Sequence, residues 1–238
     1  MKAKAIVVAF FLIIVSAFSA QAGKVQEPIF FNGLNDHAEI SNARGKVNGF
    51  ADFVPGIVGN GLKLYDDSSI SFFVYLSDTG TIDFCIKPEF DVKEMYEGES
   101  VGIFETDNFP GPDSFGVWVY KSEWGPVVIF EAKDSKGNFV QAWSKVTKFE
   151  FNKWHGITLN WGCNKTKYKK NWGQVTVDGK KGKKKKGFGQ YIDLGEQTLV
   201  FGDNSFWSYA GKTATFENLK VYDLKVKSSW KKTRKLIE

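Results

Sequence analysis

The chain has 238 residues and a formal net charge of +5, with 42% hydrophobic and 16% aromatic residues. This is an ordinary globular composition, and it argues against an intrinsically disordered chain because enough apolar residues are present to form a core. Because the net charge is modest, the dense lysine cluster between residues 180 and 186 is a local feature and not a property of the whole surface.

The first 22 residues predict a secretory signal peptide. Lys2 and Lys4 give a basic start, 5–18 is an apolar run, and "AQA" (20–22) is a small-x-small cleavage site. The apolar run is shorter than the roughly 20 residues that span a bilayer. We therefore expect a secreted or periplasmic protein without a transmembrane segment after cleavage. Residues 23–238 are expected to form one domain with a basic C-terminal tail.

Short apolar stretches recur along the rest of the chain and are separated by Gly, Pro, Asn, Asp and Ser. They are rich in Val, Ile, Phe, Tyr, Trp and Thr, the residue types that fit a pleated surface. Only the tail after Leu224 carries a trace of helical periodicity. The pattern predicts an all-β sandwich or barrel. The predicted strands are Gly61–Tyr65, Ile70–Tyr75, Thr81–Lys87, Val101–Glu105, Phe115–Tyr120, Val127–Ala132, Phe139–Trp143, His155–Trp161, Gly173–Val177, Thr198–Phe201 and Thr215–Tyr222.

Four landmarks follow one another in a recognisable order. They are the Gly/Asn-rich stretch ending in "PGIVGNGLKLYDD" (55–67), "GTIDFCIKPEF" (80–90), "FNKWHGITLNW" (151–161) leading to "WGQVTVDGK" (172–180), and "LVFGDNSFWSYAGKTATFENLKVYDL" (199–224). Together they resemble the laminin-G-like jelly roll of the concanavalin A-like lectin/glucanase superfamily. The resemblance implies a concanavalin A-like jelly-roll β-sandwich of two antiparallel sheets over nearly all of 23–238.

The same resemblance leaves the function open, because this superfamily includes lectin-like modules, adhesion domains, pentraxins, glycoside hydrolases and polysaccharide lyases. It implies calcium at the sandwich edge, held by Asp and Asn oxygens. The candidate ligands are Asp203 and Asn204, where pentraxins place calcium ligands, and Asp36 and Asp223 near the two ends of the chain.

The two cysteines, Cys85 and Cys163, are either paired, as an oxidising compartment favours, or two buried thiols. In pentraxins a bridge joins the strand equivalent to "TIDFCIKP" with the one equivalent to "HGITLNW". Cys85 fits that pattern, whereas Cys163 lies beyond the end of the second strand.

A glycosidase needs two carboxylates across a sugar. The nearest pair is Glu105 and Asp107, which has no third acid and runs straight into a turn. Lyases of this fold use an Arg, a Gln or Asn, a His and a Tyr on the concave face. The only arginines are Arg44 and Arg234, neither of them in a predicted strand, and of the two histidines, His37 and His155, only His155 lies in one. The sequence does not support catalysis.

Sugar-binding sites on β-sandwiches use flat aromatic faces. Trp118 and Tyr120 share one face of a strand because they are two residues apart. The alternative for both, and for Trp143, is sandwich core. Further candidates are Trp124 in the turn "KSEWGP" and Trp207 and Tyr209 in a polar loop.

The stretch "VDGKKGKKKKG" predicts a strand that enters a tight Asp-Gly turn and then an exposed, mobile lysine segment. We expect loop here and not strand, since lysines repel one another across a ladder. The candidate anion contacts are Lys180, Lys181, Lys183, Lys184, Lys185 and Lys186. Such a segment attracts acidic polysaccharides or phosphate polymers, with nucleic acid the least expected partner. The alternative is a solvated loop that aids solubility.

The leading hypothesis is an exported, non-enzymatic module that binds glycans or cell-surface polymers, with a structural calcium and an anion-attracting lysine segment. The first alternative is a glycoside hydrolase or polysaccharide lyase on the same fold. The second alternative is a structural extracellular or envelope protein.

Overall fold

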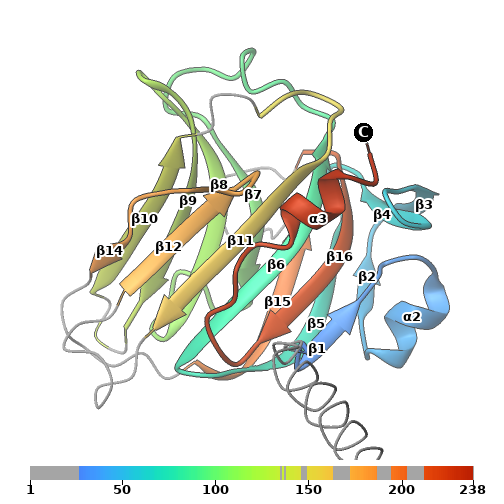
Figure 1. The fold of residues 1–238 in the computed structure, drawn as a ribbon, viewed down its shortest axis with the longest axis horizontal. Coiled ribbons are helices and arrows are strands. Elements are labelled where there is room, and N and C mark those ends of the chain that lie inside the picture. Colours follow the sequence, from blue (N-terminus) through green and yellow to red (C-terminus); the bar gives the residue numbers. More distant parts are fainter. Residues whose placement is uncertain are drawn as a thin grey trace, which may run out of the picture.

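The protein is a sandwich of two antiparallel β-sheets, as predicted (Figure 1). The computed structural model describes residues 27–134, 136, 138–145, 149–162, 172–186, 194–202 and 212–237, and in these ranges the side chains of Val140 and Lys186 are not described. Among the described residues, no helix is long and apolar enough to cross a membrane. The signal-peptide prediction falls on residues outside those ranges.

Sheet A contains nine of the described strands, in the order β13-β12-β11-β6-β16-β4-β3, with β1 paired to β16 and β14 paired to β12. Its strands are β1 (Phe30–Asn32), β3 (Ala51–Pro55), β4 (Asn60–Leu64), β6 (Thr79–Pro88), β11 (His155–Gly162), β12 (Trp172–Val177), β13 (Lys180–Lys181), β14 (Lys185–Lys186) and β16 (Ala214–Tyr222).

Sheet B contains seven described strands in the order β10-β9-β8-β7-β15-β5-β2. They are β2 (Lys46–Asn48), β5 (Ser69–Leu76), β7 (Ser100–Thr106), β8 (Ser114–Ser122), β9 (Gly125–Lys133), β10 (Phe139–Lys145) and β15 (Gly195–Gly202). Each predicted strand overlaps an observed one.

Buried and more exposed side chains alternate along the strands, which places the core between the two sheets. In β8, Val117 and Val119 are buried, whereas Trp118 and Tyr120 on the opposite face are half-buried. This is the two-residue period of a strand with one face in the core. The centre of the core is aromatic, since Phe104 stacks on Phe201 with 4.9 Å between ring centroids.

Two short helices and five short strands are absent from the predicted strands, and two of these five, β13 and β14, lie in the lysine segment. Helix α2 (His37–Asn42) begins at Asp36, whose Oδ1 accepts a hydrogen bond from the backbone N–H of Glu39 at 2.8 Å. This is an ordinary N-cap contact. Helix α3 (Trp230–Arg234) lies in the C-terminal tail and crosses the outer face of sheet A (Figure 1). Of the five additional strands, β1, β2 and β3 lie before residue 56.

The outer face of sheet A carries a polar layer that is itself buried. Thr158 and Asn160 of β11 lie beside Thr176 and Gln174 of β12, and all four side chains are buried. Part of this layer is covered by the C-terminal tail, because the Oγ1 of Thr81 donates to the carbonyl of Leu224 at 2.8 Å. Sheet A is therefore packed on its inner face and, where the tail covers it, on its outer face as well.

Candidate functional site

The turn between β12 and β13 is the tight Asp-Gly turn that the sequence predicts. Asp178 and Gly179 have φ values of 49° and 73°, and this pair of positive values is typical of the type I′ turn that closes a two-residue hairpin. The carboxylate of Asp178 accepts a hydrogen bond from the Gly156 N–H at 2.9 Å and contacts His155 Nδ1 at 2.8 Å. His155 Nε2 accepts from the Glu150 N–H, so the ring holds the turn in place.

The lysine segment contains two short edge strands, β13 and β14, so the prediction of loop was wrong at Lys180–Lys181 and Lys185–Lys186, whereas 182–184 lie outside any strand. Lys181 pairs with Thr176, and Lys185 pairs with Gly173. The backbone N–H of Gly182 donates to the carbonyl of Val175 at 2.7 Å between these pairs. The repulsion expected across a ladder does not arise, because the partner strand β12 is uncharged. The lysines instead form a row along the outermost edge of sheet A.

A groove lies between this row and the edge strand β10 of sheet B. It has a volume of about 340 Å³ and we name it the lysine groove. Trp143 is 42% exposed, and Lys185 Nζ lies 5.4 Å from the centroid of its ring. This distance is within the range of a cation–π contact. The lining residues are Trp143, Ser144, Lys145, Lys180, Lys181, Gly182, Lys183 and Lys185.

Gly182 lets the two sheet edges approach. A Cβ at this position would lie 2.6 Å from the carbonyl oxygen of Trp143 and 3.0 Å from the Cβ of Ser144. Only a glycine fits such a close approach without movement of β10. Gly182 thus sets the width of the lysine groove.

The groove is positively charged because its ammonium groups are not neutralised. Lys180, Lys181, Lys183 and Lys185 form no ion pair with another described residue. At one end the charge extends to Lys145, whose Nζ lies 6.0 Å from the ring centroid of Trp124. Trp124 is 73% exposed. The arrangement combines flat indole faces with cations, which suits a ligand that has both C–H surfaces and negative charge.

The structure also places the other predicted aromatic contacts. Trp118 and Trp143 lie in one row of the outer face of sheet B, with Ile129 between them. The ring of Trp118 packs on Phe109 with 5.8 Å between centroids, and Trp118 and Tyr120 are half-buried. Among these residues Trp143 and Trp124 offer the exposed ring faces. Trp207 and Tyr209 lie outside the described residues.

The candidate calcium ligands are not brought together where the structure describes them. Strand β1 pairs with β16, so the two ends of the domain do meet, with Phe30 opposite Val221. Asp36 lies beyond one end of this pair and Asp223 beyond the other. No group of three or more potential metal-ligating side chains occurs among the described residues, and Asp203 and Asn204 fall outside them.

The predicted disulfide is not supported. Cys85 is a free, buried thiol in β6 that lies opposite Gly156 of β11. Burial raises the pKa of this thiol well above its usual range. Cys163 lies outside the described residues.

The acidic candidates lie on the outer face of sheet B. Glu105 aligns with Gly116 and Glu131 across β7, β8 and β9, whereas Asp107 is exposed beyond the end of β7. The ring of Phe109 covers the middle of this row, since a Cβ on Gly116 would lie 3.0 Å from it. The space between Glu105 and Glu131 is thus occupied by an aromatic ring.

The candidate lyase residues are dispersed. His37 begins α2 and packs edge-on against Phe53 with 4.8 Å between centroids. Arg44 follows α2, Arg234 lies in α3, and His155 supports the β12–β13 turn. The structure does not bring these side chains to one place.

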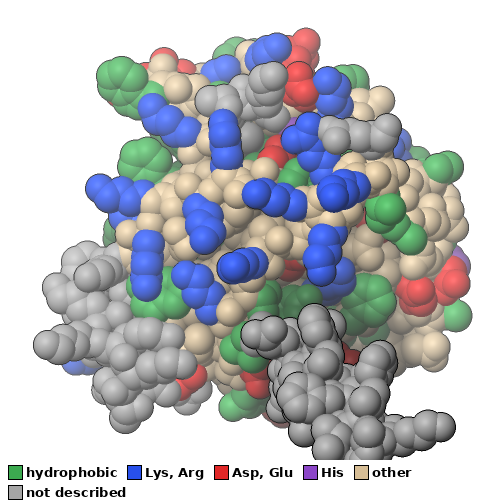
Figure 2. Space-filling model, in the orientation of Figure 1, with side chains coloured by type: hydrophobic (Ala, Val, Ile, Leu, Met, Phe, Trp, Pro, Cys, Tyr) green, Lys and Arg blue, Asp and Glu red, His purple; other side chains and the backbone are tan. Residues whose placement is uncertain are grey.

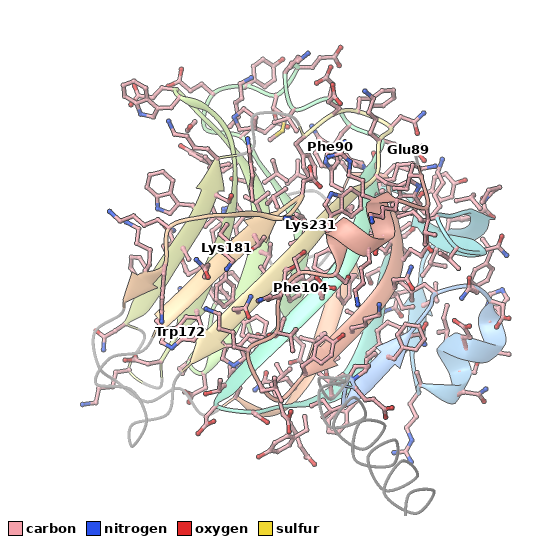
Figure 3. The ribbon with its side chains drawn as sticks, viewed as in Figure 1. Glu89, Phe90, Phe104, Trp172, Lys181 and Lys231 are labelled. Carbon is pink, nitrogen blue, oxygen red and sulfur yellow. The ribbon has the colours of Figure 1, made fainter. Side chains whose placement is uncertain are left out.

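A second hollow of about 390 Å³ lies near Glu89 and Phe90, at another end of the molecule (Figure 3). Its Glu99 pairs with Lys212 at 2.7 Å, and its Glu89 pairs with Lys63 at 2.6 Å. The hydrogen bond from Lys212 lowers the pKa of Glu99. Two carboxylates of this hollow are therefore neutralised by the protein's own lysines, in contrast to the lysine groove.

Comparison with known proteins supports the fold. The chain is similar to domain 4 of AbnA, a GH43 extracellular arabinanase from Geobacillus stearothermophilus solved in complex with arabinotriose, with a TM-score of 0.60 and 13% identity over 89% of this chain and 98% of that one. It is also similar to the botulinum neurotoxin serotype D/C VPI 5993 binding domain, with a TM-score of 0.63 and 12% identity over 88% of this chain. The type G receptor-binding domain gives a TM-score of 0.60 and 13% identity.

The chain spans about half the length of these neurotoxin domains, 52% and 51% respectively. No protein-family model matches the sequence, and no curated protein matches it either. At these identities the likeness establishes a β-sandwich shared with binding domains and nothing about the ligand.

Proposed function

We propose that this protein is an exported, non-enzymatic binding module of the laminin-G-like, concanavalin A-like type that binds an acidic glycan in the lysine groove. The observation that carries the proposal is that Trp143 lies beside the lysine row, at the edge where β13 of sheet A approaches β10 of sheet B. The sequence raised both elements separately, and the fold puts them in one hollow.

The chemistry of the groove favours a sugar acid over a neutral sugar. An indole face packs well against the C–H face of a pyranose ring, while lysine ammonium groups act as point charges for carboxylate or sulfate. In a neutral-glycan site the same lysines would remain unpaired. The structural neighbours support a binding role in coarse terms, since one was solved with an arabinotriose and another is a receptor-binding domain.

The test is a binding titration with acidic and neutral polysaccharides across a salt series, with and without chelator. We expect acid-selective binding that weakens as salt rises, because exposed charge pairs are screened. Chelator sensitivity would extend the proposal to the calcium implied by the resemblance. Release of reducing ends during the titration would instead point to the hydrolase alternative.

Matched variants locate the site. Replacing Lys181, Lys183 and Lys185 by glutamine should weaken binding by about tenfold or more, which is roughly 1.4 kcal/mol. Replacing the exposed Lys46, Lys93 and Lys136 by glutamine removes the same charge elsewhere and should change affinity little. Equal losses in the two variants would show that net charge alone binds the glycan and would overturn the assignment to the groove. Trp143→Ala should weaken binding without changing the salt dependence.

A further inference from the structure

The C-terminal tail supplies a second row of lysines beside the first. Among its exposed residues are Lys225, Lys227, Lys231 and Lys232. Figure 2 shows Lys and Arg side chains distributed across the face formed by β12, β11 and α3. The sequence marked this tail as basic, with a trace of helical periodicity, but gave no reason to place it next to the residues of the lysine groove.

The tail is anchored to sheet A between Leu224 and Trp230. The backbone N–H of Val226 donates to Thr81 Oγ1 at 3.0 Å, and Ser229 Oγ donates to Asp83 Oδ2 at 2.5 Å. Trp230 is buried over Gly156, where a Cβ would lie 2.6 Å from the indole. The lysines of the tail are therefore carried on a fixed backbone.

The two rows meet at both ends of β12. At its start, the ring centroid of Trp172 lies 3.8 Å from Lys184 Nζ and 4.9 Å from Lys225 Nζ, so one indole contacts a lysine from each row. Past its end, a Cβ on Gly179 would lie 3.8 Å from Lys231 Cγ. Because β12 has six residues, these two points are about 20 Å apart. Figure 3 shows Trp172, Lys181 and Lys231 on this one face.

The acidic groups of this face are largely compensated by the protein itself. Asp83 is buried beneath Ser229, and Asp178 is held by His155 and by the Gly156 N–H. Asp223 is exposed at the start of the tail, outside the stretch between Trp172 and Gly179. Between the two rows, the outward residues of β12 are the uncharged Gln174 and Thr176.

We propose that the lysine groove and the tail lysines form one continuous surface for an extended polyanionic polysaccharide that carries several acidic groups in succession. This inference rests on the proposed function and specifies its ligand as an internal stretch of a charged chain rather than a single acidic terminus. Lysines distributed over about 20 Å cannot all reach one sugar acid, yet neighbouring ones lie close enough to reinforce one another within a Debye length. A chain that crosses from Lys181 to Lys231 gains from both rows.

The test compares heparin-derived saccharides of increasing length, namely a disaccharide, a hexasaccharide and the polymer, with three triple variants. The tail variant is Lys225→Gln/Lys231→Gln/Lys232→Gln, and the groove variant is Lys181→Gln/Lys183→Gln/Lys185→Gln. The control is Lys46→Gln/Lys93→Gln/Lys136→Gln. Each removes three positive charges, and thermal melting confirms that each variant is folded.

We expect the tail variant to bind the disaccharide as the unmodified protein does and to bind the polymer about tenfold more weakly. The slope of log affinity against log salt should fall with the number of lysine contacts removed. The groove variant should lose affinity for every length, and the control should lose little for any.

The outcomes separate the two proposals. If the tail variant matches the control on the polymer, or if the disaccharide binds as tightly as the polymer, the extended surface is refuted while the groove assignment stands. If no heparin saccharide binds to the unmodified protein, the proposed function itself fails. Tighter binding of single-stranded DNA of equal charge, weakened by both variants, would overturn the choice of a polysaccharide.

Discussion

Ser229 and Asp83 are 146 positions apart in the sequence, and the hydroxyl of Ser229 donates a hydrogen bond to the buried carboxylate of Asp83, with 2.5 Å between Oγ and Oδ2. The same carboxylate accepts a hydrogen bond from Thr158 Oγ1 on its other oxygen. This carboxylate therefore ties the C-terminal tail to β6 and β11.

Removal of this hydroxyl should loosen the tail. We expect Ser229→Ala to lower the free energy of unfolding by about 1–3 kcal/mol, because it leaves a buried carboxylate with one partner fewer. Urea denaturation measures the loss, and limited proteolysis should show earlier cleavage in residues 224–237. Ser41→Ala, at an exposed serine of α2, is the control. A Ser229→Ala protein as stable as that control would contradict the anchoring role.

The stability of the protein should depend on pH through Asp83. Burial raises the pKa of Asp83, opposed by the hydrogen bonds from Ser229 and Thr158, which lower it. The folded state therefore holds this proton more tightly than the unfolded state does. The stabilisation is complete below the unfolded pKa, near the usual 3.8, and is lost as pH rises through the folded pKa.

Asp83→Asn should remove this part of the pH dependence. We expect the free energy of unfolding of the unmodified protein to fall relative to that of Asp83→Asn as pH rises from about 3 to about 7. Burial also raises the pKa of Glu217, which remains in both proteins and cancels in the difference. A difference between the two proteins that is constant with pH, or that changes in the opposite direction, would show that the pKa of Asp83 is not raised.

Gly182 should be intolerant of a side chain. Gly182→Ala places a methyl group against the carbonyl of Trp143, so β10 and the lysine row must separate, at a cost of about 1–3 kcal/mol. Affinity for acidic saccharides should fall at the same time, since the groove widens. Gly102→Ala in β7 is the matched control, because a Cβ there meets nothing within 4 Å. Equal melting temperatures for the two variants would refute the close approach of the two sheet edges.

The aromatic centre of the sandwich should dominate its stability. Phe104 stacks on Phe201 and packs edge-on against Phe84 with 5.7 Å between centroids, and it belongs to the buried core. Phe104→Ala should cost about 3–5 kcal/mol, because it leaves a cavity in a packed core. Tyr75→Ala, at a residue that is 62% exposed, should cost less than about 0.5 kcal/mol. Similar losses for both would contradict the position of the core.

The parts of the fold that were predictable are those encoded locally. The alternation in Gly173–Val177 followed by Asp178-Gly179 predicted a strand and a tight turn, and both were confirmed. The turn was predictable because its positive φ values are favoured by these two residues themselves. The alternation around Trp118 correctly put Trp118 and Tyr120 on one face of β8, but it left open which face is core, and the structure buries Val117 and Val119 instead.

The parts that were missed depend on distant partners. The lysines were expected in a loop because they would repel lysines on a partner strand, yet their partner is the uncharged β12, which the local sequence does not reveal. Trp172 was not recognised as the residue that joins two lysine rows, since Lys225 lies 53 positions away in the sequence. Helix α3 lies in the tail after Leu224, where the sequence carries a trace of helical periodicity, but neither its bounds nor its position on sheet A was predicted, because long-range contacts such as that of Trp230 with Gly156 fix them.

The lysine row also determines how copies of this protein meet one another. β13 and β14 are the outermost strands on one side of sheet A, where unpaired backbone groups would otherwise recruit a strand from a second molecule. Two molecules that approached through this edge in antiparallel fashion would place lysine against lysine. Mutual repulsion would oppose this pairing, and a polyanion that neutralises the row would weaken that opposition.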